Sequence, residues 1–96
     1  MTLTILHVED NSFVADAVRD MLEEEGWSVV TCSDGATALN RLATGDAYDL
    51  LILDNQLPGA SGMEIVRYAR SLPSRRHTPI IMFSATESSG SGPTFI

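Results

Sequence analysis

The chain has 96 residues, a net charge of −7 at pH 7, one cysteine and no lysine, so we expect one small acidic domain. Its acidity argues against direct binding to nucleic acids, which depends on basic side chains, and no apolar run approaches the roughly 18 residues of a membrane helix. Because Cys32 alone cannot form an internal disulfide and no export signal opens the chain, we expect a cytoplasmic protein.

Apolar runs with many β-branched residues alternate along the chain with patterns of helical period. Strands are predicted at Leu3 to Val8, Ser28 to Cys32, Leu50 to Asp54 and Ile80 to Phe83. The first intervening helix is predicted to bury Phe13, Val14, Ala17, Val18, Met21 and Leu22. The second should bury Ala38, Leu39 and Leu42, and the third Ile65, Val66, Ala69 and Leu72. This alternation predicts an α/β fold, a doubly wound parallel sheet with helices on both faces.

Residues that begin and end helices stand at the expected places. Asn11 or Ser12 can cap the first helix, and Asp34 can cap the second. Ser61 and Glu64 have the spacing of a capping box at the start of the third. Gly26 should end the first helix in a left-handed conformation, since a glycine adopts it without steric cost.

Acidic residues stand where two predicted strands end. Asp54 closes the run from Leu50, and Glu9 and Asp10 follow the first strand. The carboxyl ends of parallel strands meet at one edge of a sheet, where ligands bind in such folds. Clustered carboxylates favour a hard cation such as Mg²⁺, beside which one carboxylate could attack phosphorus. Ser84, after the fourth strand, would supply a hydroxyl donor.

Three stretches around these acids carry a family resemblance: Ile5 to Asn11, Asp49 to Gly62 and Thr78 to Ala85. In residue types, order and spacing they resemble the receiver domain of two-component response regulators, over about the first 87 residues. The resemblance implies a flavodoxin-like fold and a signalling module rather than an enzyme with an external substrate. It also implies Mg-dependent phosphorylation from a sensor histidine kinase.

The same resemblance assigns roles to individual residues. Asp54 would be the phospho-acceptor. The metal ligands would be Glu9, Asp10, Asp54 and Gln56, with Glu9 acting through a water and Gln56 through its backbone carbonyl. Ser84 would bind a phosphoryl oxygen, and Ala85 would leave room for it and offer a backbone amide.

The resemblance ends before the chain does. Family members continue with a helix, a fifth strand ending in lysine and proline, and a last helix, whereas residues 88–92 here contain only serine and glycine. We therefore expect a receiver-like domain at 1–87, lacking the usual last strand and helices, and a flexible tail at 88–96. The exposed edge of Ile80 to Phe83 could pair with another copy to form a homo-oligomer. Alternatively, Thr94 to Ile96 could join that edge as a strand, in its own sheet or a neighbour's.

The sequence also allows other functions for the chain and purely structural roles for several of its residues. The chain could be a truncated or engineered receiver fragment with impaired switching that acts as an assembly unit. An aspartyl-phosphate hydrolase would need an acid where Gln56 stands, and a flavin phosphate would be repelled by the acids after the first strand. The remaining notable side chains are expected to be structural: His7 packed and hydrogen-bonded, Cys32 in the core, and Arg75, Arg76 and His77 in a solvated loop.

Overall fold

The computed structural model describes residues 2–54, 57–83 and 93–96. In chain order the elements are β1 (Thr4–Val8), α1 (Ser12–Glu24), β2 (Ser28–Cys32), α2 (Gly35–Ala43), β3 (Leu50–Asp54), α3 (Gly62–Ser71), a 3₁₀ turn (Pro73–Arg75), β4 (Ile80–Phe83) and β5 (Pro93–Phe95). Among these residues, no helix is long and apolar enough to cross a membrane.

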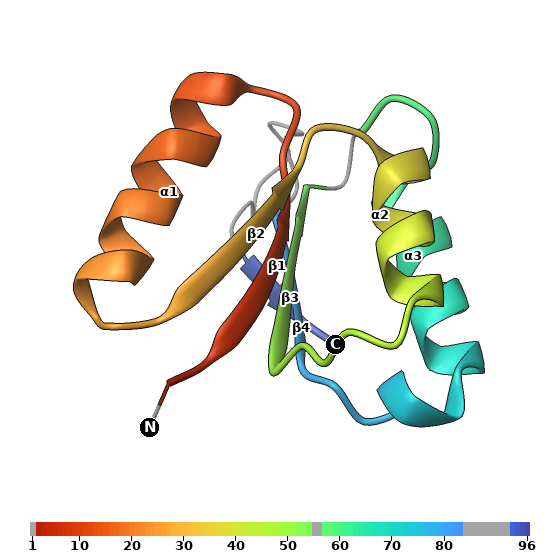
Figure 1. The fold of residues 1–96 in the computed structure, drawn as a ribbon. Helices are drawn as coiled ribbons and strands as arrows, with labels where there is room; N and C mark the ends of the chain where they lie inside the picture. Colours follow the sequence, from red (N-terminus) through yellow and green to blue (C-terminus); the bar gives the residue numbers. More distant parts are fainter. Residues whose placement is uncertain (1, 55–56, 84–92) are drawn as a thin grey trace.

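The five strands form one sheet in the order β2-β1-β3-β4-β5 (Figure 1). The first four strands are parallel, which confirms the predicted doubly wound sheet, and β5 runs antiparallel to β4. From β1 the chain passes to β2 on one side and later returns to β3 on the other. The carboxyl ends of β1 and β3 therefore flank the point at which the strand order reverses.

The sequence suggested that the edge of β4 is exposed, but in the structure β5 pairs with this edge. Phe95 of β5 pairs with Ile81, and the backbone N–H of Ile96 donates to the carbonyl of Ile80 at 2.8 Å. The expectation of an exposed fourth-strand edge is therefore wrong, because the end of the chain satisfies those backbone groups. The alternative, in which Thr94 to Ile96 adds a strand to its own sheet, is confirmed.

Two helices, α2 and α3, cover one face of the sheet and form the main core with it (Figure 1). Helix residues that the sequence assigned to this core are buried there: Ala38, Leu42, Ile65, Val66 and Ala69. Leu39 and Leu72 pack against the same core while partly exposed, and Cys32 lies within it as predicted.

The opposite face carries only α1 among the described elements (Figure 1). The buried face predicted for this helix is largely wrong, since Phe13, Val14, Ala17 and Met21 are exposed and only Ala15 is buried. Among the described residues, this single helix covers only part of the sheet face, so the side of α1 next to the uncovered part packs against none of them.

The predicted helix ends are confirmed. The Asn11 side chain accepts hydrogen bonds from the N–H groups of residues 13 and 14, and Asp34 accepts one from residue 37. Ser61 and Glu64 form the reciprocal capping box, and Gly26 has a φ of 87°. Local contacts therefore determine where each helix begins.

Arg75 is not in a solvated loop, as the basic cluster had suggested, but is 3% exposed. Its guanidinium donates to the carbonyl oxygens of Leu42 at 3.0 Å, Thr44 at 3.0 Å and Asp46 at 2.6 Å. It also lies over the ring of Tyr48, 5.0 Å from its centre. A planar group with several N–H donors can satisfy the carbonyls that a helix leaves unpaired at its C-terminus, which explains why this arginine is buried.

Candidate functional site

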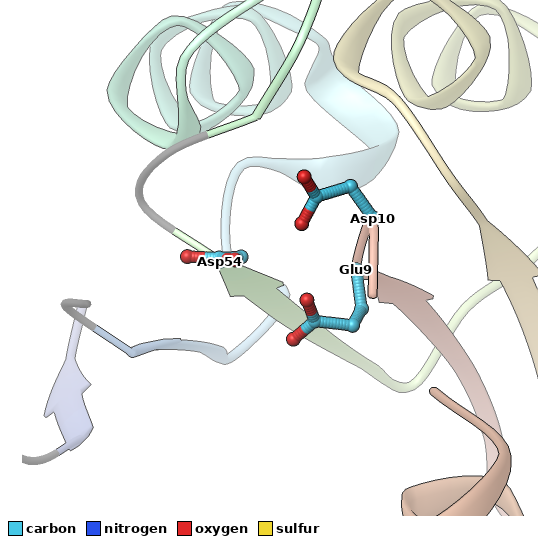
Figure 2. Close-up of side chains that lie close together, drawn as sticks. All are labelled: Glu9, Asp10 and Asp54. Carbon is cyan, nitrogen blue, oxygen red and sulfur yellow. The ribbon is translucent and has the colours of Figure 1, made fainter. Parts of the chain in front are cut away.

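Three carboxylates meet at the rim of the sheet where β1 and β3 end. Asp54 is the last residue of β3, and Glu9 and Asp10 follow β1 directly. Val8 stands opposite Leu53 in the parallel pairing, so the two strands end level with one another. Figure 2 shows the three carboxyl groups together at this rim, and one oxygen from each lies within 4.8 Å of the others. The predicted convergence of these acids is thus seen in the structure.

Glu9 is held by backbone groups from two other parts of the chain. Its N–H donates to the carbonyl of Cys32 at the end of β2, at 2.9 Å. Its carboxylate accepts the N–H of Asn11 at 3.1 Å. Asn11 thus has a second function beside capping α1, one that its residue type did not reveal because the bond uses its backbone. These contacts orient the Glu9 carboxylate toward the acid cluster.

Burial and repulsion within the cluster both raise the pKa of the Glu9 carboxyl. Partial burial is the largest cause that raises the pKa of its carboxyl, and the negative charges of Asp54 and Asp10 raise that pKa further. The N–H of Asn11 acts in the opposite direction. Bringing these negative charges together in the folded chain is therefore unfavourable in free energy, and a bound cation would offset the repulsion.

His7 lies in β1, two residues before Glu9, with 3% of its surface exposed. Burial lowers the pKa of its imidazole, while the charge of Asp54 works against that change. The expectation of a packed histidine is confirmed, although Nδ1 has no hydrogen-bond partner among the described residues. A buried imidazole whose pKa is lowered is neutral at pH 7, so it does not cancel the charge of the acids.

The loop after β3 rests on the first turn of α2. The N–H of Gly35 donates to the carbonyl of Pro58 at 2.8 Å, and Gly59 adopts a φ of 88°. A Cβ atom at Gly35 would lie 2.3 Å from the carbonyl oxygen of Ala60. This close approach sets the path of the chain a few residues beyond Asp54, and the sequence did not predict it because the partners are far apart in the chain.

The acid cluster has the donors that a hard divalent cation requires. All three side chains offer carboxylate oxygens, and no nitrogen or sulfur ligand belongs to the group. Opposite ligands of Mg²⁺ are about 4.2 Å apart, given metal–oxygen bonds of about 2.1 Å. The observed spacing of at most 4.8 Å needs only a small rotation of the side chains to match it. Glu9, Asp10 and Asp54 could therefore hold such an ion, with water completing the coordination.

The other predicted site residues, Gln56, Ser84 and Ala85, lie outside the described residues. The strand before Ser84 is described, and its last residue, Phe83, pairs with Asp54 in the sheet. The roles expected for these residues stay predictions.

In buffer free of divalent cations, we expect Asp54→Asn to increase the free energy of unfolding by about 1 kcal/mol. Asparagine keeps the shape of the side chain and removes its repulsion with two partly solvated neighbours. Urea unfolding with a chelator present measures this change. Asp20→Asn, on the exposed side of α1, controls for net charge and should change stability little. A less stable Asp54→Asn protein would contradict the view that repulsion dominates here.

Together, the strand order and the carboxylate cluster define a doubly wound α/β protein with an acidic site at its topological switch point. The family model for the response regulator receiver domain matches residues 5–93, and the chain belongs to that family. Receiver domains are modules of two-component signalling.

Relatives of known sequence and structure agree with this assignment. The polar-differentiation response regulator DivK of Brucella ovis is 34% identical over 85 residues, which are 88% of this chain and 68% of that protein. The receiver domain of sensor histidine kinase PA1611 from Pseudomonas aeruginosa, solved with magnesium in its active-site cleft, superposes with a TM-score of 0.84 at 30% identity. That match covers 94% of this chain and 73% of the other.

A third match comes from a solved complex between histidine kinase ThkA and the response regulator protein TrrA. Its TM-score is 0.78 at 31% identity, and it covers 94% of this chain and 75% of the other. These neighbours share the flavodoxin-like fold, so the fold expected from the resemblance is confirmed.

Proposed function

We propose that this chain is a phospho-acceptor module in which Asp54 accepts a phosphoryl group from a sensor histidine kinase. The observation that carries the proposal is the cluster of Glu9, Asp10 and Asp54 within 4.8 Å at the switch point of the sheet. Membership of the receiver family supports it, as does the solved complex of a similar response regulator with a histidine kinase.

The proposed transfer uses the carboxylate of Asp54 as the nucleophile. One carboxylate oxygen attacks phosphorus and forms an acyl phosphate, while the bond from phosphorus to the donor's imidazole nitrogen breaks. The bonding electrons leave with that nitrogen. Ser84 and the backbone amide of Ala85 are proposed to hold phosphoryl oxygens. The module acts on no external substrate, so we infer that it is not an enzyme in the usual sense.

Glu9 and Asp10, together with Asp54 and the carbonyl of Gln56, are proposed to hold Mg²⁺. When bound, the ion supplies positive charge that offsets the clustered carboxylates and the phosphoryl oxygens. The acidic donor set and the magnesium in the similar PA1611 receiver domain support this choice of ion. The protein's own contribution is to fix the acceptor oxygen beside that charge, because β1 and β3 end level with one another.

The test is to incubate the purified chain with Mg²⁺ and acetyl phosphate and to weigh the intact protein by mass spectrometry. We expect one added phosphoryl group on the wild-type chain, none on Asp54→Asn, and none when a chelator removes the metal. Since the chain has no lysine to pair with the phosphoryl group, we expect slow but measurable transfer.

Asp49→Asn is the matched control, because Asp49 lies near the opposite end of β3 and its carboxylate accepts the N–H of Thr4. It should be phosphorylated like the wild type. An unmodified wild-type protein, or equal addition to Asp54→Asn, would overturn the proposal.

A further inference from the structure

A groove of about 410 Å³ lies between α1 and the sheet face opposite α2 and α3. Its lining is mostly apolar and comes from one side of α1 and from the sheet: Val14, Val18, Met21, Leu22, Ile52 and Phe83, with His7 and Glu9 as the polar members. Among the described elements, α1 alone lies on this face (Figure 1). The groove is therefore a mostly apolar space between that helix and the sheet.

Large exposed apolar side chains gather around this groove. Phe83 is 47% exposed, and Phe95 is 76% exposed. Phe95 pairs with Ile81, two residues before Phe83, and side chains two apart on a strand share a face, so both phenylalanines lie on the groove's side of the sheet.

The side of α1 at the edge of the groove forms a second apolar feature, which we call the α1 ridge: Phe13, Ala17 and Met21, of which Met21 also lines the groove. These residues are four apart, so they lie along one side of the helix. Phe13 is 86% exposed and Met21 is 59% exposed. The α1 ridge is apolar and protrudes from the helix, so the ridge of one molecule could pack into the mostly apolar groove of another.

We propose that two copies of this chain form a symmetric dimer in which the α1 ridge of each copy packs into the groove of the other. A twofold axis requires that the same patch be used on both copies, and a ridge and a groove side by side on one face meet this requirement. A phenylalanine side chain covers roughly 150–250 Å² when buried. The exposed parts of three phenylalanines and Met21 thus supply much of the roughly 800 Å² that each partner contributes to a stable interface.

Charge shapes the expected behaviour of this dimer. Asp16 and Asp20 border the α1 ridge, since they stand three residues after Phe13 and Ala17. Glu9 lines the groove, so the contact brings acidic side chains of the two copies near one another. Each copy also carries a net charge of −7. The two copies repel one another at low ionic strength, and added salt screens this repulsion, so dimerisation should strengthen as salt increases.

The experiment is sedimentation equilibrium on the full chain from low to high micromolar concentration. We expect a concentration-dependent dimer, and Phe13→Asp should weaken it by at least about tenfold. An aspartate in the first turn of a helix is favourable, so this variant should fold. Met63→Asp, on a residue 40% exposed at the start of α3, is the control and should dimerise like the wild type.

A mixing experiment tests the reciprocal geometry. Phe13→Asp damages the ridge and Phe83→Asp damages the groove, so each variant alone loses both contacts of its dimer. An equimolar mixture keeps one intact contact, between the unmutated ridge of the Phe83→Asp copy and the unmutated groove of the Phe13→Asp copy. The mixture should therefore associate more strongly than either variant alone.

A monomeric wild type, or a Phe13→Asp protein that dimerises unchanged, would overturn the proposal. Asp54→Asn should leave the dimer intact, so failure of the phosphorylation proposal would be recognised separately.

Discussion

Replacing Arg75 by alanine is expected to lower the free energy of unfolding by about 3 kcal/mol. The guanidinium donates to three carbonyl oxygens, those of Leu42, Thr44 and Asp46, from a position 3% exposed. Alanine would leave these acceptors unpaired near the end of α2 and would open a cavity beside Tyr48. Because a domain of this size has a total stability of roughly 5–15 kcal/mol, the loss is a large part of it.

Urea or thermal unfolding followed by circular dichroism measures the effect. Arg75→Lys should recover only a minor part of the stability, since one ammonium group cannot reach three carbonyls in a planar arrangement. Arg76→Ala is the matched control, because the neighbouring arginine is exposed. If Arg75→Ala and Arg76→Ala were equally stable, the three hydrogen bonds would have no net stabilising effect.

Gly35→Ala is expected to lower the free energy of unfolding by about 2–3 kcal/mol and to slow phosphorylation of Asp54. The added Cβ would meet the carbonyl oxygen of Ala60 at 2.3 Å and its backbone nitrogen at 2.6 Å. These are backbone atoms, so the strain cannot be relieved by turning a side chain. The loop after β3 would have to move, and with it the surroundings of Asp54.

Gly45→Ala is the control for this change, because a Cβ at Gly45 meets nothing within 4 Å. Adding Ala60→Gly to the Gly35→Ala protein removes one of the three close atoms and leaves the two backbone contacts. We therefore expect at most partial recovery of stability and of the rate of acetyl phosphate transfer. Full recovery would show that the Ala60 side chain, rather than the backbone, is the obstacle.

Local features of the sequence were sufficient to predict the elements and the site's acids. Each cap depends on contacts within three residues, as with Asn11 and with Ser61 and Glu64. The strands that form the parallel sheet are largely apolar runs. In this topology β1 and β3 are neighbours, so the acids at their carboxyl ends meet. The convergence of Glu9, Asp10 and Asp54 therefore follows from their positions along the chain.

Tertiary structure alone decided the features that depend on distant or absent neighbours. The spacing of apolar residues along α1 predicts an apolar face on the helix. Whether Phe13 on that face is buried depends on which other elements cover the same side of the sheet, and a local sequence pattern does not contain this information. Arg75 looked like a surface charge because its three acceptors are about 30 residues away. The sequence offered β5 as one of two possibilities for the edge of β4, and the structure decided between them, because backbone hydrogen bonds carry no signature in the side chains. The sequence by itself thus determined the elements and the acidic site, whereas packing between distant segments decided which apolar and charged side chains are buried.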